Sequence, residues 1–338
     1  MLNYAVIGCG ASGKVHGYYF SNHPEVNLLS VTDTNQKALE FFNSTFSPKY
    51  SGSKLENLLT IKPDIVSIAT PPAFHKEQIL SLGGFCKYIF CEKPLSTTYE
   101  DTITIIDFCK KQNIVLGVML PRRFYNNSRS VKKVLESHSI GKIKNASFIL
   151  ECFKSREYHS TWRGKKSIAG GGVLLSQSIH SIDQLVYFFG RPVSVEGKIR
   201  TTRDYLEVED EAEGRITFLD GLVVDVKVSA NTDKLWRGIT KIVGEKGSIV
   251  LDSADTILWD VPYHERPKKE ETEPIPKELK PSYYGPGHKK VIDDFIESIL
   301  NKREPTITGE NILEASRIIF GIYKSSEIGK PVVLSELV

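Results

Sequence analysis

The sequence has few cysteines, and they show no pairing pattern. Its 338 residues include five cysteines, an odd number without C-x-x-C spacing, and most of them stand in apolar segments. This pattern argues against a disulfide framework and against a cysteine-based metal site. We expect all five to be reduced core side chains. They are Cys9, Cys86, Cys91, Cys109 and Cys152.

Long apolar runs and a charge excess of one sign are also missing. No apolar run reaches the roughly 18 residues of a membrane span, and MLNYAVIGCG has no basic lead or cleavage site of a secretory signal. The 44 basic and 41 acidic residues give a net charge of +3, too even to imply a nucleic-acid or membrane partner. We find no internal repeat or low-complexity segment. We therefore expect a cytoplasmic protein that acts on a small molecule.

The first third of the chain shows the pattern of a dinucleotide-binding domain. NYAVIGCGASGKVHGYYF reads as an apolar strand, a turn written Gly8-x-Gly10-x-x-Gly13, and a helix. Glycines at this spacing allow a tight turn and close backbone approach to a pyrophosphate, while the helix N-terminus supplies amide donors. A second strand, VNLLSVTD, ends at Asp33, whose carboxylate can accept the adenosine-ribose hydroxyls. It would also repel a 2′-phosphate, which favours NAD over NADP.

Strands and helices continue to alternate up to about residue 121. This rhythm predicts a doubly wound parallel sheet with right-handed crossovers. Ligands of such sheets lie beyond the carboxyl ends of the strands, so TPPAFH from Thr70 and CEKP from Cys91 are expected near the nicotinamide. The helices are expected over 36–46, 75–82 and 99–111, and the strands over 64–70, 88–93 and 114–120.

Two side chains of these segments are candidates for chemistry. Pro94 stops strand pairing after Lys93 and fixes the turn, for which a cis bond is one option. Lys93 could be an ordinary surface lysine, but the glycine turn on the same sheet edge favours a role in binding ribose or stabilising an alkoxide. His75 stands at a helix start, where a structural capping role and a ligand contact are equally open.

The second half of the chain changes to strands of period-two character, two pairs of which are joined by turns at Asp220-Gly221 and Lys246-Gly247. The pattern predicts a large, mostly antiparallel sheet, with helices at 127–136 and 172–189 to cover one face. The other face would be open to substrate or to another subunit. The strands are expected within 141–153, 195–202, 212–230, 240–252 and 256–261.

The length of the chain exceeds that of a usual single core, which favours two domains. We expect a Rossmann domain over 1–121 and an α/β substrate-binding and oligomerisation domain over 122–338. Two amphipathic helices, within 287–305 and 308–331, end the chain and could pack back on the first domain.

The segment AGGGVLLSQSIHSIDQL, residues 169–185, predicts a helix that starts on three glycines. Ser176, His180 and Asp183 stand at i, i+4 and i+7, which would place them on one side of that helix. Taken alone, His180 fits a hydrogen-bonded core histidine better than a catalytic residue. Because glycine costs about 1 kcal/mol against alanine inside a helix, we interpret the glycine run as room for a ligand. Metal binding is not expected, since no second histidine is spaced to join Asp183.

These motifs together resemble the Gfo/Idh/MocA oxidoreductases, the family of glucose-fructose oxidoreductase and inositol dehydrogenase. The resemblance implies a Rossmann domain and an α/β domain whose open sheet commonly forms homodimers or homotetramers, with substrate between nicotinamide and sheet. It also implies hydride transfer at a ring hydroxyl of a sugar, cyclitol or nucleotide-linked sugar. The motifs are the glycine turn, TPP followed by His75, CEKP with Lys93, RRF at 122–124, TWR at 161–163 and GGGVLLSQSIHSID at 170–183.

The resemblance assigns roles by position. Lys93 matches the lysine of the family's E-K-P motif, which contacts cofactor ribose and substrate, and His180 matches the general acid/base. The family often has an aspartate four residues before this histidine, where Ser176 stands here and cannot supply negative charge. Catalysis would rest on His180 and Lys93, or borrow Asp183. In the expected reaction His180 accepts the hydroxyl proton, Lys93 stabilises the oxyanion, and the carbinol hydrogen passes as hydride to NAD.

The expected site includes basic residues that suit a phosphate or carboxylate, although a solvated basic surface is the equal alternative. PSYYGPGH, residues 281–288, could fold over a sugar or cap the next helix. The basic set is Arg123, Lys154, Arg156, Arg163, Lys165 and Lys166. The expected substrate contacts are Lys93, Arg123, Trp162, Arg163, Ser176, Gln177, His180 and Tyr283. The expected cofactor contacts are Gly8, Gly10, Ala11, Ser12, Gly13, Asp33, Thr70, Pro71, His75, Glu92 and Lys93.

Three functions stay open at this point. The first is an NAD-dependent dehydrogenase of a nucleotide-linked or acidic sugar, with a neutral sugar or inositol as the alternative substrate. The second is a reductase that uses NADPH, against which Asp33 argues. The third is a regulator that binds NAD and sugar without catalysis, which Ser176 favours and the presence of Lys93 and His180 opposes.

Overall fold

The computed structural model describes residues 1–271, 275–279 and 285–337. The chain forms two compact units, each discontinuous in sequence. The first unit includes a segment from the C-terminal part of the chain. The domain boundary expected at residue 121 stays a prediction. The first unit consists of Met1–Ser96, Glu100–Leu120 and Thr272–Glu310, and the second of Thr97–Tyr99, Pro121–Glu271 and Asn311–Val338.

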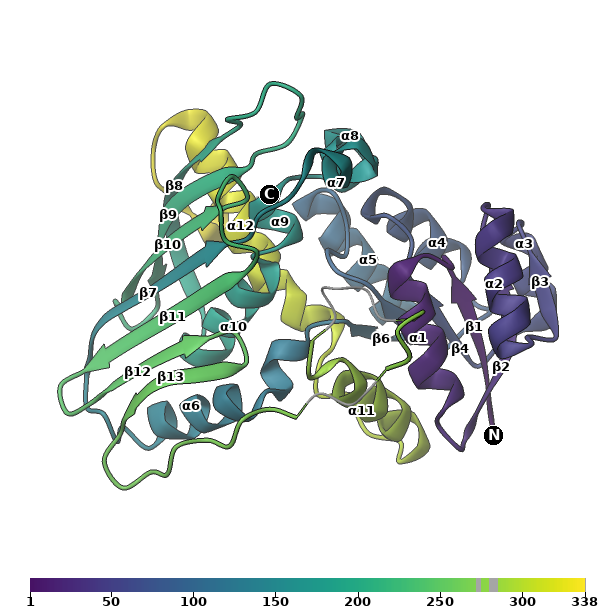
Figure 1. Ribbon diagram of the computed structural model, residues 1–338, viewed down its shortest axis with the longest axis horizontal. Coiled ribbons are helices and arrows are strands. Elements are labelled where there is room, and N and C mark those ends of the chain that lie inside the picture. Colours follow the sequence, from purple (N-terminus) through teal and green to yellow (C-terminus); the bar gives the residue numbers. More distant parts are fainter. Residues whose placement is uncertain (272–274, 280–284, 338) are drawn as a thin grey trace. The chain divides into compact units, whose positions relative to one another are not determined.

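The first unit is built on a six-stranded parallel sheet of order β3-β2-β1-β4-β5-β6 (Figure 1). All four residues of β4 are buried, as are three of the four in β5, which is typical of a parallel sheet covered on both faces. The expected doubly wound sheet is confirmed. The sequence pattern missed β3, a three-residue strand at the sheet edge. The strands are β1 (Leu2–Ile7), β2 (Val26–Thr32), β3 (Tyr50–Gly52), β4 (Ile65–Ile68), β5 (Tyr88–Cys91) and β6 (Val115–Val118).

Helices follow the strands β1 to β5, and one further helix comes from the C-terminal part of the chain. That helix, α11, packs on the sheet through Phe295, whose ring centroid lies 5.2 Å from that of Phe90 in β5. Phe90 also meets the ring of Phe20 in α1 at 5.7 Å, so aromatic side chains join helix, sheet and helix. The helices are α1 (Ala11–Ser21), α2 (Gln36–Phe46), α3 (Glu56–Ile61), α4 (His75–Ser81), α5 (Tyr99–Lys111) and α11 (His288–Leu300).

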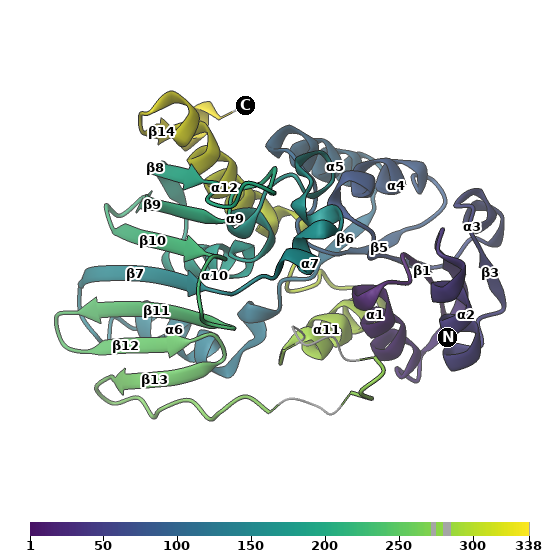
Figure 2. The ribbon, with the colours of Figure 1, turned by 45° about the horizontal axis from the view of Figure 1, so that its top comes forward.

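The second unit is built on an eight-stranded sheet of order β13-β12-β11-β7-β10-β9-β8-β14, and Figure 2 shows most of its strands side by side. Every neighbouring pair is antiparallel except β7 and β10, which are parallel. The expected mostly antiparallel sheet is confirmed. The strands are β7 (Ile143–Glu151), β8 (Pro192–Arg200), β9 (Glu211–Phe218), β10 (Val223–Ser229), β11 (Arg237–Gly244), β12 (Ser248–Asp252), β13 (Asp255–Asp260) and β14 (Val332–Val333).

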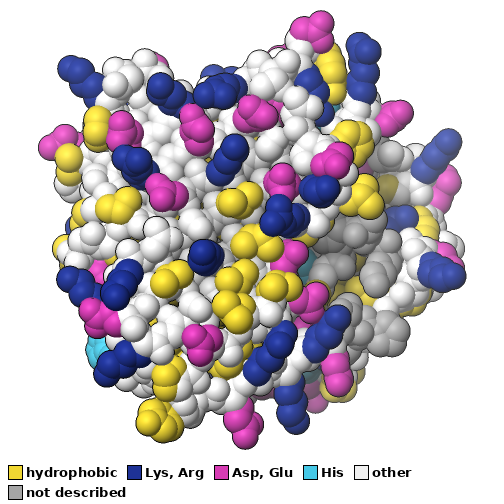
Figure 3. All heavy atoms as spheres, turned by 60° about the vertical axis from the view of Figure 1, so that its left-hand side comes forward, with side chains coloured by type: hydrophobic (Ala, Val, Ile, Leu, Met, Phe, Trp, Pro, Cys, Tyr) yellow, Lys and Arg dark blue, Asp and Glu magenta, His cyan; other side chains and the backbone are white. Residues whose placement is uncertain are grey.

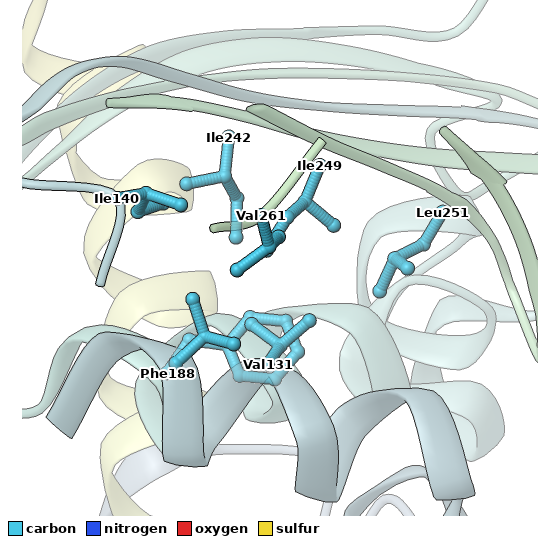
Figure 4. Close-up of a cluster of buried hydrophobic side chains, with 8 residues drawn as sticks. Val131, Ile140, Phe188, Ile242, Ile249, Leu251 and Val261 are labelled. Carbon is cyan, nitrogen blue, oxygen red and sulfur yellow. The ribbon is translucent and has the colours of Figure 1, made fainter. Parts of the chain in front are cut away.

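One face of this sheet is covered by helices, as expected. Val131 of α6 (Asn126–Glu136) and Phe188 of α10 (Ile179–Phe189) pack against Ile242 and Ile249 of the sheet (Figure 4). The long helix α12 (Gly309–Ile328) covers β8, where the main-chain N–H of Gly197 donates to the Ser325 hydroxyl at 3.0 Å.

The other face of the sheet carries exposed side chains. Apolar residues of this face, among them Ile149, Val223 and Leu258, stand among charged ones such as Lys227 and Arg215. Figure 3 shows apolar side chains gathered between basic and acidic ones. This face of the sheet therefore presents both apolar and charged side chains.

Two further features concern the chain as a whole. The five cysteines are free and buried, as expected. Within the described residues, no helix combines the length and the apolar character needed to cross a membrane.

Candidate active site

The glycine turn after β1 has the geometry of a dinucleotide cradle. Gly8 has φ +93°, and a Cβ there would lie 2.7 Å from the carbonyl carbon of Ala69. A Cβ on Gly13 would lie 1.8 Å from the Gly8 oxygen, so both positions require glycine for packing. Around a Cβ on Gly10, by contrast, no atom of the described residues lies within 4 Å. The open space is at the residue where the backbone must meet a pyrophosphate.

The first turn of α1 and the end of β2 complete this cradle. Gly10 is the N-cap of α1, no side chain caps that turn, and it contains no acidic residue, so its amides suit an anion. The Asp33 carboxylate at the end of β2 accepts the N–H of Cys9 at 2.6 Å and that of Asn35 at 2.7 Å. These bonds fix the carboxylate beside the turn and leave lone pairs for hydroxyl groups. The residues present fit NAD.

We expect Gly10→Ala to weaken NAD binding by about tenfold or more without lowering the midpoint of thermal unfolding, because φ −71° suits alanine and the methyl group would fill only the open space. Isothermal titration with NAD and a thermal unfolding scan measure the two effects. Gly13→Ala is the matched variant, and it should lower the unfolding midpoint because its Cβ meets backbone. Unchanged NAD affinity in Gly10→Ala would count against the cradle.

His75 links the two loops that follow β4 and β5. Its ring is fully buried, with Nδ1 3.1 Å from the Pro94 oxygen and Nε2 2.8 Å from the Thr70 oxygen. Burial lowers the pKa of His75, which disfavours the charge needed to donate to both oxygens at once. These contacts favour the structural alternative for His75. Contacts of His75, Thr70 and the half-buried Pro71 with the cofactor stay predictions.

Glu92 and Lys93 stand directly after β5, and the Lys93–Pro94 bond is cis. The Glu92 carboxylate is buried, with Oε1 3.1 Å from Nε2 of His16, and its Oε2 accepts the main-chain N–H of Lys93 at 3.2 Å. Burial acts to raise the pKa of Glu92, but the hydrogen bond and charge of His16, with the charges of Lys93 and His288, lower the pKa to about 2. Glu92 is therefore an ionised, buried carboxylate beside the expected catalytic lysine.

His288, the first residue of α11, belongs to the same neighbourhood, whereas the sequence suggested a sugar contact or a helix cap for its segment. Its Nδ1 donates to the Gly285 oxygen at 2.8 Å. Burial lowers the pKa of His288 to about 4, against the effects of that bond and of Glu92, so the ring is neutral near pH 7. The expected substrate contact Tyr283 lies outside the described residues.

The glycine run of the second unit has another role than expected. A Cβ on Gly172 would lie 1.7 Å from the main-chain oxygen of Glu209, and one on Gly171 would lie 2.1 Å from the Tyr323 hydroxyl oxygen. Gly170 has φ +78° and lies against the backbone of Thr97. Protein atoms therefore occupy the space beside all three glycines. The interpretation of the run as room for a ligand is wrong.

A buried carboxylate that the sequence did not reveal holds this turn. Glu209 accepts the N–H of Gly172 at 2.7 Å and that of Leu174 at 3.0 Å, as well as the Tyr323 hydroxyl at 2.9 Å. Burial raises the pKa of Glu209, although these hydrogen bonds act to lower it. The carboxylate thus satisfies amides at the start of α9 (Val173–Ser176), which leads toward His180.

The helix expected over 172–189 is interrupted between α9 and α10. The N–H of Ser178 donates to the Val173 oxygen, five residues back, at 3.0 Å, and the Ser178 hydroxyl donates to the Leu174 oxygen. This widened turn competes with the regular helix ladder. Ser176 ends α9 and His180 lies in α10, so the expectation that both share one continuous helix with Asp183 is wrong.

Asp183 is committed to an ion pair. Its fully buried carboxylate receives two nitrogens of Arg123, with Nη2 to Oδ1 at 2.6 Å and Nε to Oδ2 at 2.9 Å. Burial raises the pKa of Asp183, although the charge of Arg123 acts to lower it. Asp183, the alternative acid to support His180, is therefore paired with Arg123. A contact of Arg123 with substrate stays a prediction. His180 and Ser176 are both half-buried.

Cations and aromatic rings gather next to Ser176. Gln177 donates through Nε2 to the Tyr158 hydroxyl at 3.0 Å and to the Ser176 hydroxyl at 3.3 Å. The Tyr158 ring lies 5.2 Å from Nζ of Lys154 and 5.1 Å from Cζ of Arg163. Two side chains of the expected basic set thus flank one ring.

The same two cations contact tryptophan rings. Nζ of Lys154 lies 5.6 Å from the centroid of Trp236, and Cζ of Arg163 lies 4.5 Å from that of Trp162. Within the described residues, neither cation has a carboxylate within 4 Å. Burial lowers the pKa of Lys154, and the charge of Arg163 lowers it further. We call Lys154, Tyr158, Trp162, Arg163 and Trp236 the cation–aromatic cluster.

A parallel sheet with a glycine cradle and an acid at the end of β2 defines a dinucleotide-binding α/β protein. Residues 2–120 match the model of the oxidoreductase family with an NAD-binding Rossmann fold, and residues 128–250 match that of the GFO/IDH/MocA C-terminal domain. The chain belongs to the Gfo/Idh/MocA family of oxidoreductases. The expected family, the enzyme class and NAD as cofactor are confirmed.

Similar proteins span almost the whole chain. The oxidoreductase YrbE of Bacillus subtilis is 26% identical over 97% of this chain and 95% of its own. The WlbA dehydrogenase of Bordetella pertussis, solved with NADH and UDP-GlcNAcA, superposes with TM-score 0.86 at 23% identity, covering 98% of both chains. Levoglucosan dehydrogenase, solved with NADH and levoglucosan, superposes with TM-score 0.83 at 25% identity, covering 99% of this chain and 100% of its own. The two solved structures share the fold of this chain.

Proposed function

We propose that the chain oxidises a ring hydroxyl of a nucleotide-linked or acidic sugar, with NAD as the oxidant. The observation that carries the substrate class is the pair of cations in the cation–aromatic cluster. The ligands named for similar structures, UDP-GlcNAcA and levoglucosan, are different sugars, so the fold alone leaves the substrate open. We therefore infer the substrate class from the residues of this chain.

The cofactor would be held by the first unit. The amides at Ala11, Ser12 and Gly13 would face the pyrophosphate, and Asp33 would accept the hydroxyls of the adenosine ribose. When bound, NAD supplies the hydride acceptor. The Asp33 carboxylate would repel the 2′-phosphate of NADP, which supports the choice of NAD.

His180 and Lys93 are the proposed catalytic residues. His180 would accept the proton of the sugar hydroxyl, leaving a carbonyl at the carbon that loses hydride. The Lys93 ammonium would stabilise the negative charge that develops on the oxygen. Ser176 is uncharged and Asp183 is paired to Arg123, so neither of these two residues is the proposed support of the imidazolium.

The substrate class follows from charge. Lys154 and Arg163 lie beside Tyr158 without a carboxylate partner among the described residues, and Lys154 is half-buried. Two adjacent cations in such a place repel one another, and a phosphate or carboxylate would relieve the repulsion. The Tyr158 hydroxyl, bonded through Gln177 to Ser176, links this charge to the helix break that precedes His180. A neutral sugar would leave both cations unpaired.

The open face of the eight-stranded sheet is the proposed contact between subunits. Ile149, Val223 and Leu258 are apolar, exposed and surrounded by charges of both signs. A self-complementary contact could pair those charges and bury the apolar side chains. We propose a homodimer or a homotetramer on this basis.

Lys154→Met tests the substrate class. We expect KM for UDP-GlcNAcA to rise about ten- to hundredfold with little change in kcat, because a charge-assisted bond is lost in ground and transition states alike. Initial rates of NADH formation measure both constants. Lys133→Met, at an exposed position of α6, is the matched control and should leave KM unchanged. Equal KM values for wild type and Lys154→Met would contradict the assignment.

A further inference from the structure

A buried pair joins the cofactor helix to the turn that carries Lys93. His16 lies in α1, one turn after Gly13, and its Nε2 is 3.1 Å from Oε1 of Glu92. The other oxygen of Glu92 accepts the main-chain N–H of Lys93, and the N–H of Glu92 donates to the Ile68 oxygen at 2.9 Å. Glu92 is thus bonded to α1, to β4 and to the catalytic turn.

The chemistry of a carboxylate determines which group donates in this pair. An ionised carboxylate only accepts hydrogen bonds, so Nε2 of His16 must donate to Glu92. His16 is fully buried and meets the Phe90 ring edge-on at 5.3 Å, which fixes its orientation. A buried carboxylate is costly unless it is paired and hydrogen-bonded. His16 donates one hydrogen bond to the Glu92 carboxylate. The cationic residue nearest to Glu92 in the sequence is Lys93.

We infer that Glu92, held in place by His16, is a positioning residue for Lys93. It fixes the main chain at the start of the lysine turn and places a buried negative charge on the residue directly before Lys93. That charge favours the protonated lysine, the form that stabilises a developing oxyanion. The inference rests on the proposed function only for the step in which Lys93 acts on substrate.

Other titratable groups surround Glu92. His16 faces it from α1, His288 from α11 and Lys93 from its own turn, and Glu92 acts in turn on His75 of α4. The pKa values of His75 and His288 are lowered by burial, so near pH 7 both rings are neutral. Glu92 is therefore the anion of this group, and the charge of Lys93 is among those that lower the pKa of Glu92.

Glu92→Gln in the full-length protein tests the inference without substrate. Removal of the negative charge should lower the pKa of Lys93 by about 1 or more. NMR of isotopically methylated lysines, with Lys93→Met to assign the signal, measures that pKa. Glu40→Gln removes an exposed carboxylate of α2 and should leave it unchanged. An unchanged Lys93 pKa in folded Glu92→Gln would overturn the inference.

A pair of variants at His16 provides a test that does not alter Glu92. Glutamine can place an amide N–H near the position of Nε2, whereas leucine has no donor. We expect His16→Leu to lower both kcat and the Lys93 pKa, and His16→Gln to restore most of each, with NAD affinity similar in the two. Equal values in His16→Leu and wild type would overturn the inference. Absence of turnover in wild type would refute the proposed function instead, and the Lys93 pKa would still decide this inference.

Discussion

His180→Ala is expected to lower kcat for sugar oxidation by about 10²- to 10⁴-fold, the usual contribution of a general acid/base. The rate should fall because His180 is the side chain proposed to accept the hydroxyl proton. Stopped-flow or steady-state formation of NADH measures it. NAD affinity should not change, since the cofactor cradle belongs to the first unit.

Added imidazole provides the control for this variant. A small base that enters the space left by His180 should restore part of the rate if the missing group is a base, but not if the variant is misfolded. The assignment of His180 fails if the alanine variant turns over near the wild-type rate. It also fails if imidazole restores nothing in a variant that unfolds at the wild-type temperature.

Lys93→Met is expected to lower kcat by about 10²- to 10³-fold, the effect of removing one donor to a developing oxyanion. Lys87→Met is the matched control, because Lys87 is an exposed lysine immediately before β5 and Lys93 follows the same strand. The control should keep the wild-type kcat.

The two constants of the rate law separate the roles of Lys93. A contact made only in the transition state lowers kcat, whereas a contact with bound sugar or ribose raises KM at constant kcat. If Lys93→Met changes KM alone, Lys93 is a binding residue and not a stabiliser of the oxyanion. If Lys93→Met changes neither kcat, KM nor NAD affinity, Lys93 is not part of the active site.

The first unit could be predicted well because its signals are local. Alternating apolar strands and helices, Gly8, Gly10 and Gly13, and Asp33 at the end of a strand each follow from neighbours in the sequence. The short strand β3 was missed because three residues carry too little pattern. In the second unit the strands and covering helices were predicted for the same reason.

The site of the second unit could not be predicted as fully, because its contacts join distant residues. The glycines at 170–172 pack against Glu209 and Tyr323, and no local pattern distinguishes such packing from room for a ligand. The break between α9 and α10 lies where both the N–H and the hydroxyl of Ser178 bond back to α9. The roles of individual site residues stay predictions until the variants are measured.

Long-range pairs changed the interpretation most. The guanidinium of Arg123, an expected substrate contact, binds the buried Asp183 sixty residues away in sequence. Glu92 was expected to meet the cofactor and is bonded to His16. In both cases the sequence supplied the charged residue, while its partner became visible only in the folded chain.

We propose that this oxidoreductase oxidises an anionic sugar with NAD through His180. The most direct measurement is the initial rate of NADH formation from NAD with UDP-GlcNAcA and, separately, with inositol, by wild type and by His180→Ala. We expect a higher kcat/KM for UDP-GlcNAcA than for inositol in wild type, and loss of nearly all of the UDP-GlcNAcA activity in His180→Ala. Equal rates in the two proteins, or NAD binding without NADH formation from either compound, would contradict it.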